Sequence, residues 1–206
     1  MKNNFFKIVL PLGLLVFATF IIGSGCGSSV PDPVTFTCST TGTEFQQLYD
    51  QVKIANPKFS DITTIDLTTH EYTFYVDTDE TICSIGYQGN ANLYTANIPY
   101  TIEIYNNSAG TLLYSGNHVF GSVSTSYKPI TGVALSGGTS YTIKRIANDY
   151  LGDIANTTGR VLSFSAVSTV LPVTFGGLSI KATNFYGKGG PIPNAGIPYI
   201  DIVLEK

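Results

Sequence analysis

Residues 100–114 read Tyr-Thr-Ile-Glu-Ile-Tyr-Asn-Asn-Ser-Ala-Gly-Thr-Leu-Leu-Tyr. In the first part of this stretch apolar and polar side chains alternate, so Tyr100, Ile102 and Ile104 share one face of an extended chain. A run rich in Asn, Ser and Gly then leads into a second extended segment, as the loop of a β-hairpin does. One buried face and one solvated face are typical of an antiparallel sheet.

The same alternation recurs along the chain from residue 34 onward, interrupted about every 8 to 15 residues by Gly, Asn, Asp or Pro. The other segments with this pattern are 72–76, 81–87, 140–146, 160–164, 178–182 and 200–204. Strands without alternating helices bury their apolar faces most simply in two stacked sheets. We therefore expect residues 34–206 to form a single all-β domain, an antiparallel two-sheet β-sandwich.

One segment, residues 44–54, has the spacing of an amphipathic helix instead. Its apolar residues follow the i, i+3, i+4, i+7 pattern: Phe45, Leu48, Tyr49 and Val52. Thr43 and Gln46 could form a capping box at its start. The domain is thus predicted to contain at most one short helix.

The first 25 residues have the organisation of a secretory signal. Lys2 and Lys7 precede a nearly continuous apolar run over residues 8–22. As a helix this run would extend roughly 23 Å, which is short of the ~30 Å hydrocarbon core of a bilayer. We therefore predict a signal helix rather than a permanent membrane span.

The segment Gly23-Ser-Gly-Cys26 resembles the bacterial lipobox, which is cleaved before a cysteine that receives a lipid. Its first glycine departs from the usual Leu. The resemblance implies that residues 1–25 are a lipoprotein signal peptide, that Cys26 carries the lipid and that residues 26–33 are a short tether. A Gly after the cysteine implies sorting to the outer membrane, hence a cell-surface location. The alternatives are an ordinary signal cleaved nearby and an uncleaved anchor.

The chain contains three cysteines. If Cys26 carries the lipid, Cys38 and Cys83 remain as an even pair, and an oxidising compartment would allow them to form a disulfide. The alternative is two buried free thiols. Their spacing matches no zinc signature.

Charge argues against one class of partner. Removing residues 1–25 leaves nine Lys and Arg against 14 Asp and Glu, a net charge of about −5. Nucleic-acid binding requires a basic face, so no nucleic-acid partner is expected.

Three segments around the hairpin carry a resemblance to a known fold. The stretches 110–116, 127–130 and 133–143 resemble jelly-roll sandwiches of unknown function in secreted bacterial proteins, which often accompany carbohydrate-active modules. The region that runs through these stretches covers about 40 of the 206 residues. It implies a jelly-roll-like sandwich and no catalytic residue. The Trp common before the turn is absent here, and Tyr127 is the candidate for its place.

Sequence motifs for catalysis are missing. Neither a nucleophile elbow nor another nucleophile motif occurs, and both histidines, His70 and His118, are expected at the surface or at a strand edge. A glycosidase needs two carboxylates facing one cleft, for which Glu71, Glu80 and Glu103 are candidates. We expect no enzymatic activity, with a polysaccharide hydrolase as the alternative.

An acidic run lies between two of the predicted strands. Asp77, Asp79 and Glu80 could offer oxygens to a structural calcium ion, although the run does not match the helix-bracketed calcium loop. The alternative, which the pattern favours, is a solvated hairpin turn. Apart from this calcium ion, no cofactor is expected.

Tyrosine is the remaining candidate for ligand binding, because the chain contains 13 Tyr and no Trp. On the outward phase of their strands, Tyr75 and Tyr105 could stack on sugar rings, although outward Tyr is also simply a good strand residue. We expect a non-catalytic, lipid-anchored protein that binds a glycan or protein or belongs to an envelope assembly. A purely structural envelope subunit is the further alternative.

Overall fold

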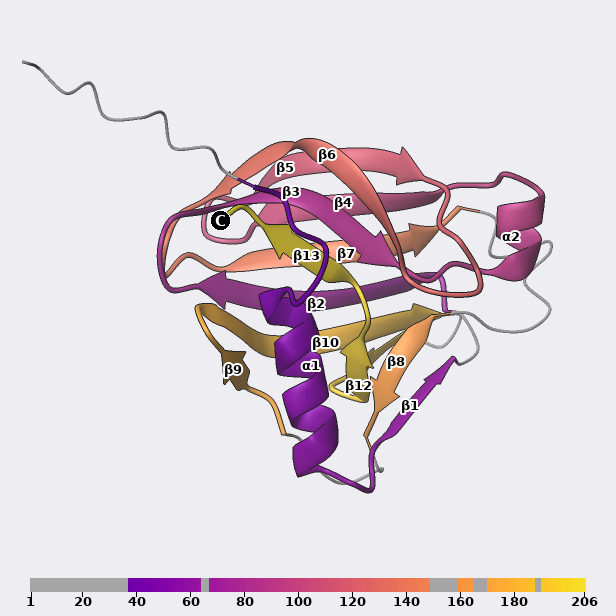
Figure 1. Cartoon of the computed structure of the whole chain (residues 1–206), viewed down its shortest axis with the longest axis horizontal. Coiled ribbons are helices and arrows are strands. Elements are labelled where there is room, and N and C mark those ends of the chain that lie inside the picture. Colours follow the sequence, from indigo (N-terminus) through magenta and orange to yellow (C-terminus); the bar gives the residue numbers. More distant parts are fainter. Residues whose placement is uncertain (1–36, 64–66, 149–158, 165–169, 188–189) are drawn as a thin grey trace, which may run out of the picture. The chain divides into compact units, whose positions relative to one another are not determined.

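The computed structural model describes residues 37–63, 67–148, 159–164, 170–187 and 190–206, all of which belong to one unit spanning residues 35–206. The predicted signal peptide, the lipid site at Cys26 and the tether lie outside the described residues. Within them the structure is mainly β, with antiparallel, open sheets (Figure 1).

The largest sheet has seven strands in the order β11-β10-β2-β7-β4-β5, with β9 also paired to β10. Every pairing in this sheet is antiparallel. The strands are β2 (Thr69–Val76), β4 (Tyr100–Asn106), β5 (Thr111–His118), β7 (Tyr141–Ala147), β9 (Val173–Phe175), β10 (Leu178–Gly187) and β11 (Gly190–Pro193). The hairpin predicted from residues 100–114 is formed by β4 and β5, so that prediction is confirmed.

Two smaller sheets complete the described strands. The first has the order β13-β3-β6 and the second the order β1-β8-β12. Their bounds are β1 (Ser60–Thr63), β3 (Glu80–Tyr87), β6 (Ser126–Leu135), β8 (Arg160–Ser163), β12 (Gly196–Pro198) and β13 (Asp201–Leu204). All seven predicted strands are present, but there are three sheets where we expected two. The additional sheet consists of strands of three or four residues.

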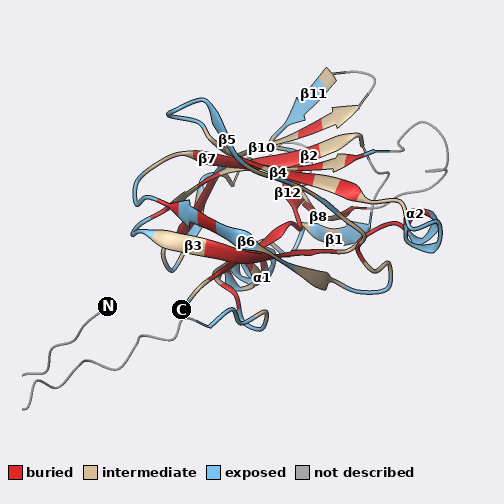
Figure 2. Ribbon diagram, turned by 90° about the horizontal axis from the view of Figure 1, so that it is seen from above, coloured by how far each residue is buried: buried red, intermediate tan, exposed pale blue. Residues whose placement is uncertain are grey.

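The hydrophobic core lies between the seven-stranded sheet and the β13-β3-β6 sheet, which face each other in Figure 2. As predicted, Tyr100, Ile102 and Ile104 of β4 are buried. The alternate residues of β4, Thr101, Glu103 and Tyr105, are half-buried on the opposite face of the sheet. This second face of the sheet is here called the outer face.

The predicted helix is confirmed as α1 (Glu44–Ala55), whose four predicted apolar residues are all buried. It contacts β9, β10 and β13. The Thr43 hydroxyl accepts a hydrogen bond of 3.0 Å from the Gln46 amide, as a capping residue does. The other half of the predicted capping box is wrong, because the Gln46 side chain accepts from the Gly42 amide instead.

The prediction of at most one helix is also wrong, because the chain forms a second, α2 (Ala91–Thr95). This helix is too short to show a periodic apolar pattern. The Asn90 side chain caps it by accepting from the amides of Asn92 and Leu93, and Leu93 is buried.

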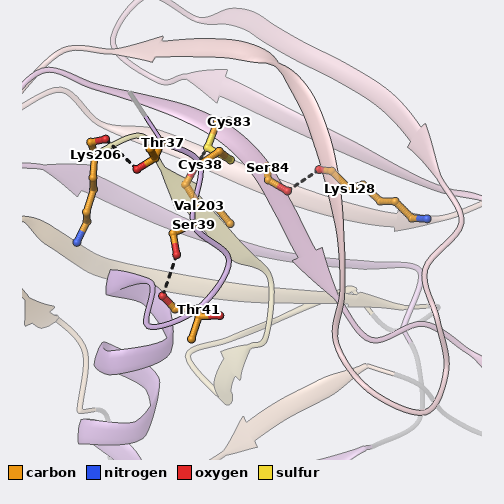
Figure 3. Close-up of a disulfide and its surroundings, with 9 residues drawn as sticks. All are labelled: Thr37, Cys38, Ser39, Thr41, Cys83, Ser84, Lys128, Val203 and Lys206. Atoms are coloured by element: carbon orange, nitrogen blue, oxygen red, sulfur yellow. Dashed lines mark hydrogen bonds between the residues drawn. A yellow bond between two sulfur atoms is a disulfide. The ribbon is translucent and has the colours of Figure 1, made fainter. Parts of the chain in front are cut away.

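The disulfide prediction is confirmed: Cys38 is bonded to Cys83 on β3 (Figure 3). Beside it, Thr37 and Lys206 exchange two backbone hydrogen bonds of 2.8 and 3.1 Å. The disulfide indicates an oxidising, extracytoplasmic compartment. Among the described helices, none combines the length and the apolar character needed to cross a membrane.

Candidate functional site

A row of polar and charged residues crosses the outer face of the seven-stranded sheet. Lys144 on β7 lies directly opposite Glu71 on β2 and directly opposite Glu103 on β4. On the far side of β2, Asn184 of β10 lies opposite Glu71. The register of β2, β7 and β4 therefore places Lys144 between Glu71 and Glu103 on the outer face.

Beside this row the outer face is hollowed into a cleft of about 260 Å³, here called the outer cleft. Its wall combines an aromatic ring with charged, amide and hydroxyl groups. The lining residues are Glu71, Tyr105, Asn106, Asn107, Gly110, Thr142 and Lys144. The loop of the β4–β5 hairpin thus forms one side of the outer cleft, and β2 and β7 form its floor.

Glu71 is the most buried charged group of the outer cleft, with 7% of the residue exposed. Its Oε1 atom accepts hydrogen bonds from Asn184 Nδ2 at 3.0 Å and from the Tyr186 hydroxyl at 2.8 Å. Burial and this hydrogen bond raise the pKa of Tyr186 to about 12, so the hydroxyl keeps its proton and remains a donor. The Oε2 atom is buried and accepts no hydrogen bond from the described residues.

The ammonium of Lys144 fills the space beside this oxygen. Its Nζ atom lies 3.4 Å from Glu71 Oε2 and 4.9 Å from the centroid of the Tyr105 ring. The Tyr105 hydroxyl donates to Glu103 Oε2 at 2.9 Å, and that hydrogen bond raises the pKa of Tyr105. The hydrogen bond to Glu103 therefore fixes the Tyr105 ring, and the Lys144 ammonium lies between this ring and the Glu71 carboxylate.

Of the two tyrosines singled out from the sequence, only Tyr105 lines the outer cleft. Tyr75 also lies on the outer face, where its partner across β10 is Ser179 and where Lys181 Nζ is 5.4 Å from its ring. The structure thus separates the two candidates. Tyr75 remains a stacking candidate by position alone.

The acidic run gains no support as a calcium site. Asp79 Oδ1 accepts a hydrogen bond of 2.9 Å from the Gly137 amide, and Glu80 accepts from Thr78. Within the described ranges, no three His, Cys, Asp or Glu side chains are grouped so that they could hold a metal ion. The run is not a hairpin turn either, because β2 and β3, which it connects, belong to different sheets.

A second cavity, of about 300 Å³, lies on the other side of β2 and β10. Its lining is mostly apolar: Leu67, His70, Val161, Ser163, Phe185, Ile192 and Ala195. His70 is fully buried on β2, an interior strand of its sheet, so the expectation of a surface or strand-edge position is wrong for this histidine. Burial, assisted by the charge of Arg145, lowers the pKa of His70 well below its usual value, so the ring is neutral. The outer cleft offers more recognition groups and is the stronger candidate site.

Several residues of the outer cleft were missed by sequence reasoning: Lys144, Thr142, Asn106 and Asn107. For Thr142 and Lys144, the signal that could have identified them was their strand phase. They alternate with the buried Tyr141, Ile143 and Arg145. Only the register across β2, β7 and β4 shows that they meet Glu71 and Tyr105.

No protein-family model and no curated protein matches this chain significantly.

Proposed function

We propose that residues 35–206 form a non-catalytic glycan-binding domain and that the outer cleft is its binding site. The observation that carries the proposal is the chemistry of the cleft wall, where one aromatic ring meets a buried carboxylate, an ammonium, amides and a hydroxyl. Sugar hydroxyls both donate and accept hydrogen bonds, and the C–H faces of sugar rings pack on aromatic rings.

The size of the outer cleft suits a small part of a glycan. Its volume of about 260 Å³ lies just below the ~300 to 1,000 Å³ of typical small-molecule sites. One sugar ring would fill it. The rest of an oligosaccharide would then extend over the polar outer face, where Thr73 and Asn184 are half-buried.

The proposal includes a location outside the cytoplasm. The disulfide between Cys38 and Cys83 fits an oxidising compartment. The lipobox-like segment before Cys26 supports a lipid tether and an outer-membrane, cell-surface location. The finer description of the fold as a jelly-roll-like sandwich belongs to the same proposal, and it is supported by the two facing sheets.

The test is a glycan array with the purified domain, followed by calorimetric titration of the glycans that bind. We expect Tyr105→Ala to weaken binding at least tenfold, because it removes the ring of the outer cleft. Tyr75→Ala is the matched control, since it removes an outward ring that also lies beneath a lysine but outside the outer cleft. Equal effects of the two substitutions, or no glycan bound at all, would contradict the proposal.

One observation favours a second function, the hydrolysis of a polysaccharide. Glu71 and Glu103 lie on the same face of the sheet, two strands apart. The backbones of such strands are about 9 to 10 Å apart, which is close to the distance between the two carboxyl groups of inverting glycosidases. Release of reducing sugar that disappears in both Glu71→Gln and Glu103→Gln would favour the hydrolase.

A further inference from the structure

Two lysines of the outer face lie over two outward tyrosines, but their surroundings differ. Lys144 lies over Tyr105 and is also paired with Glu71 at 3.4 Å. Lys181 lies over Tyr75, and no acidic side chain among the described residues forms an ion pair with it. Only the first lysine therefore occupies a site with both a carboxylate and a ring.

The groups around the Lys144 ammonium make a site for a cation. The face of an aromatic ring attracts a positive charge, and Glu71 Oε2 is a buried acceptor that no described residue satisfies with a hydrogen bond. Glu103, opposite Lys144 on β4, adds a second negative charge. Without the lysine ammonium, the described lining of the outer cleft would carry the Glu71 carboxylate and no positive charge, with Glu103 adjacent on the same face of the sheet.

From this arrangement we infer that the Lys144 ammonium occupies the position of a ligand ammonium, and that the outer cleft binds a sugar with a free primary amine. The inference rests on the proposed glycan-binding function and names the class of sugar. An incoming ammonium would replace Lys144 beside Glu71 and over Tyr105. Acidic sugars would be repelled by the same carboxylates.

The lysine is able to leave. Its side chain is 33% exposed, and its flexible stem carries the ammonium into solvent by rotation about single bonds. Glu71 stays in place when this happens, because Asn184 and Tyr186 hold its other oxygen. The exchange thus replaces one ammonium with another and keeps the hydrogen bonds of the carboxylate.

The experiment compares glucosamine oligomers with N-acetylglucosamine oligomers of the same length by calorimetry at about pH 6. Removal of the internal competitor in Lys144→Met is expected to raise the affinity for glucosamine oligomers about tenfold relative to the affinity for N-acetylglucosamine oligomers. Lys181→Met is the matched control and is expected to change neither. Glu71→Gln, which keeps the shape of the side chain, is expected to abolish the preference for the amine.

A measurement on the unmodified protein makes the test independent of the variants. In lysine-labelled protein, the Cε–Hε signals of Lys144 should move towards the values of an exposed lysine during titration with glucosamine oligomers. The signals of Lys181 should stay unchanged. Thermal unfolding of Lys144→Met shows whether that variant is folded.

Three outcomes would overturn the inference. Loss of binding in Lys144→Met would make the lysine a direct ligand contact, and unchanged binding would remove its role as a competitor. In both cases, the proposed function stays intact if glycan binding by the protein with Lys144 in place depends on Tyr105. If Lys144→Met instead prefers oligolysine to the amino sugar, the ligand class is wrong. A protein that binds no glycan in any form contradicts the proposed function itself.

Discussion

The Tyr127 hydroxyl donates a hydrogen bond of 2.7 Å to Oδ2 of Asp201, a carboxyl group that is fully buried. Thr43 Oγ1 and Gln46 Nε2 donate to the same carboxyl at 2.8 and 2.9 Å. Burial nevertheless raises the pKa of Asp201 to about 6, because these hydrogen bonds offset only part of the lost solvation. One titratable group thus joins β6 and the start of α1 to β13.

This raised pKa predicts that stability falls as the pH rises. The folded state binds the proton of Asp201 more tightly than the unfolded state, whose pKa is near 3.8. The contribution of about 3 kcal/mol is therefore complete below about pH 4 and is lost as the pH rises through about 6. Urea unfolding between about pH 4 and 7 should show this slope in the wild type and in the exposed control Asp50→Asn. The same slope in Asp201→Asn would contradict the assignment.

Asp61 on β1 predicts the opposite dependence. Burial alone would raise its pKa, but hydrogen bonds from Arg160 and Lys53 outweigh burial and hold the pKa well below the usual range. Its contribution is present above about pH 4 and lost as the pH falls further. We expect Asp61→Asn to lower the free energy of unfolding by about 1 to 3 kcal/mol at pH 7. The difference from the wild type should shrink towards about pH 2, and a constant difference would count against this explanation.

The Cys38–Cys83 disulfide closes a loop between residues 45 positions apart. On the chain-entropy model such a loop contributes roughly 4 kcal/mol. The double substitution Cys38→Ala and Cys83→Ala should therefore lower the free energy of unfolding by about 2 to 4 kcal/mol. Urea unfolding of the wild type with a reductant should give a similar loss. A fully reduced wild type with unchanged stability would disprove this role.

The hydroxyl of Thr43 has two partners, since it caps α1 and donates to Asp201. Thr43→Ala should destabilise the domain by about 1 to 2 kcal/mol, because both interactions are lost. Thr43→Ser keeps the hydroxyl and should lose much less. Thermal unfolding measures both, with exposed Thr41→Ala as the control. Equal losses in the serine and alanine variants would show that the methyl group matters instead.

Local patterns predicted the elements of this fold better than their arrangement. Period-two alternation identified β4, and helical spacing identified α1, because burial of one face fixes both periods. The same alternation runs through His70, Tyr72 and Phe74, so the burial of His70 was readable from its phase. The turn after β2 was not readable as a change of sheet, because pairing partners far along the chain decide it.

The candidate site was even less predictable from local sequence patterns than the arrangement of the strands. The outward phase of Tyr105 was visible from β4 alone. Its contact with Lys144 and the burial of Glu71 depend on the register of β2, β7 and β4, strands that are far apart in the sequence. No local pattern carries that information, and so a cleft built across three strands became visible only in the structure.

The pairing of Thr37 with Lys206 and the bond from Cys38 to Cys83 have a mechanical consequence. A pulling force that reaches the domain along the chain before Thr37 passes through the disulfide into β3. That strand is the middle one of its sheet, hydrogen-bonded to β13 on one side and to β6 on the other. The covalent bond therefore shields α1, which follows Cys38 in the chain, so that unravelling from this end must first disrupt a strand held along both edges.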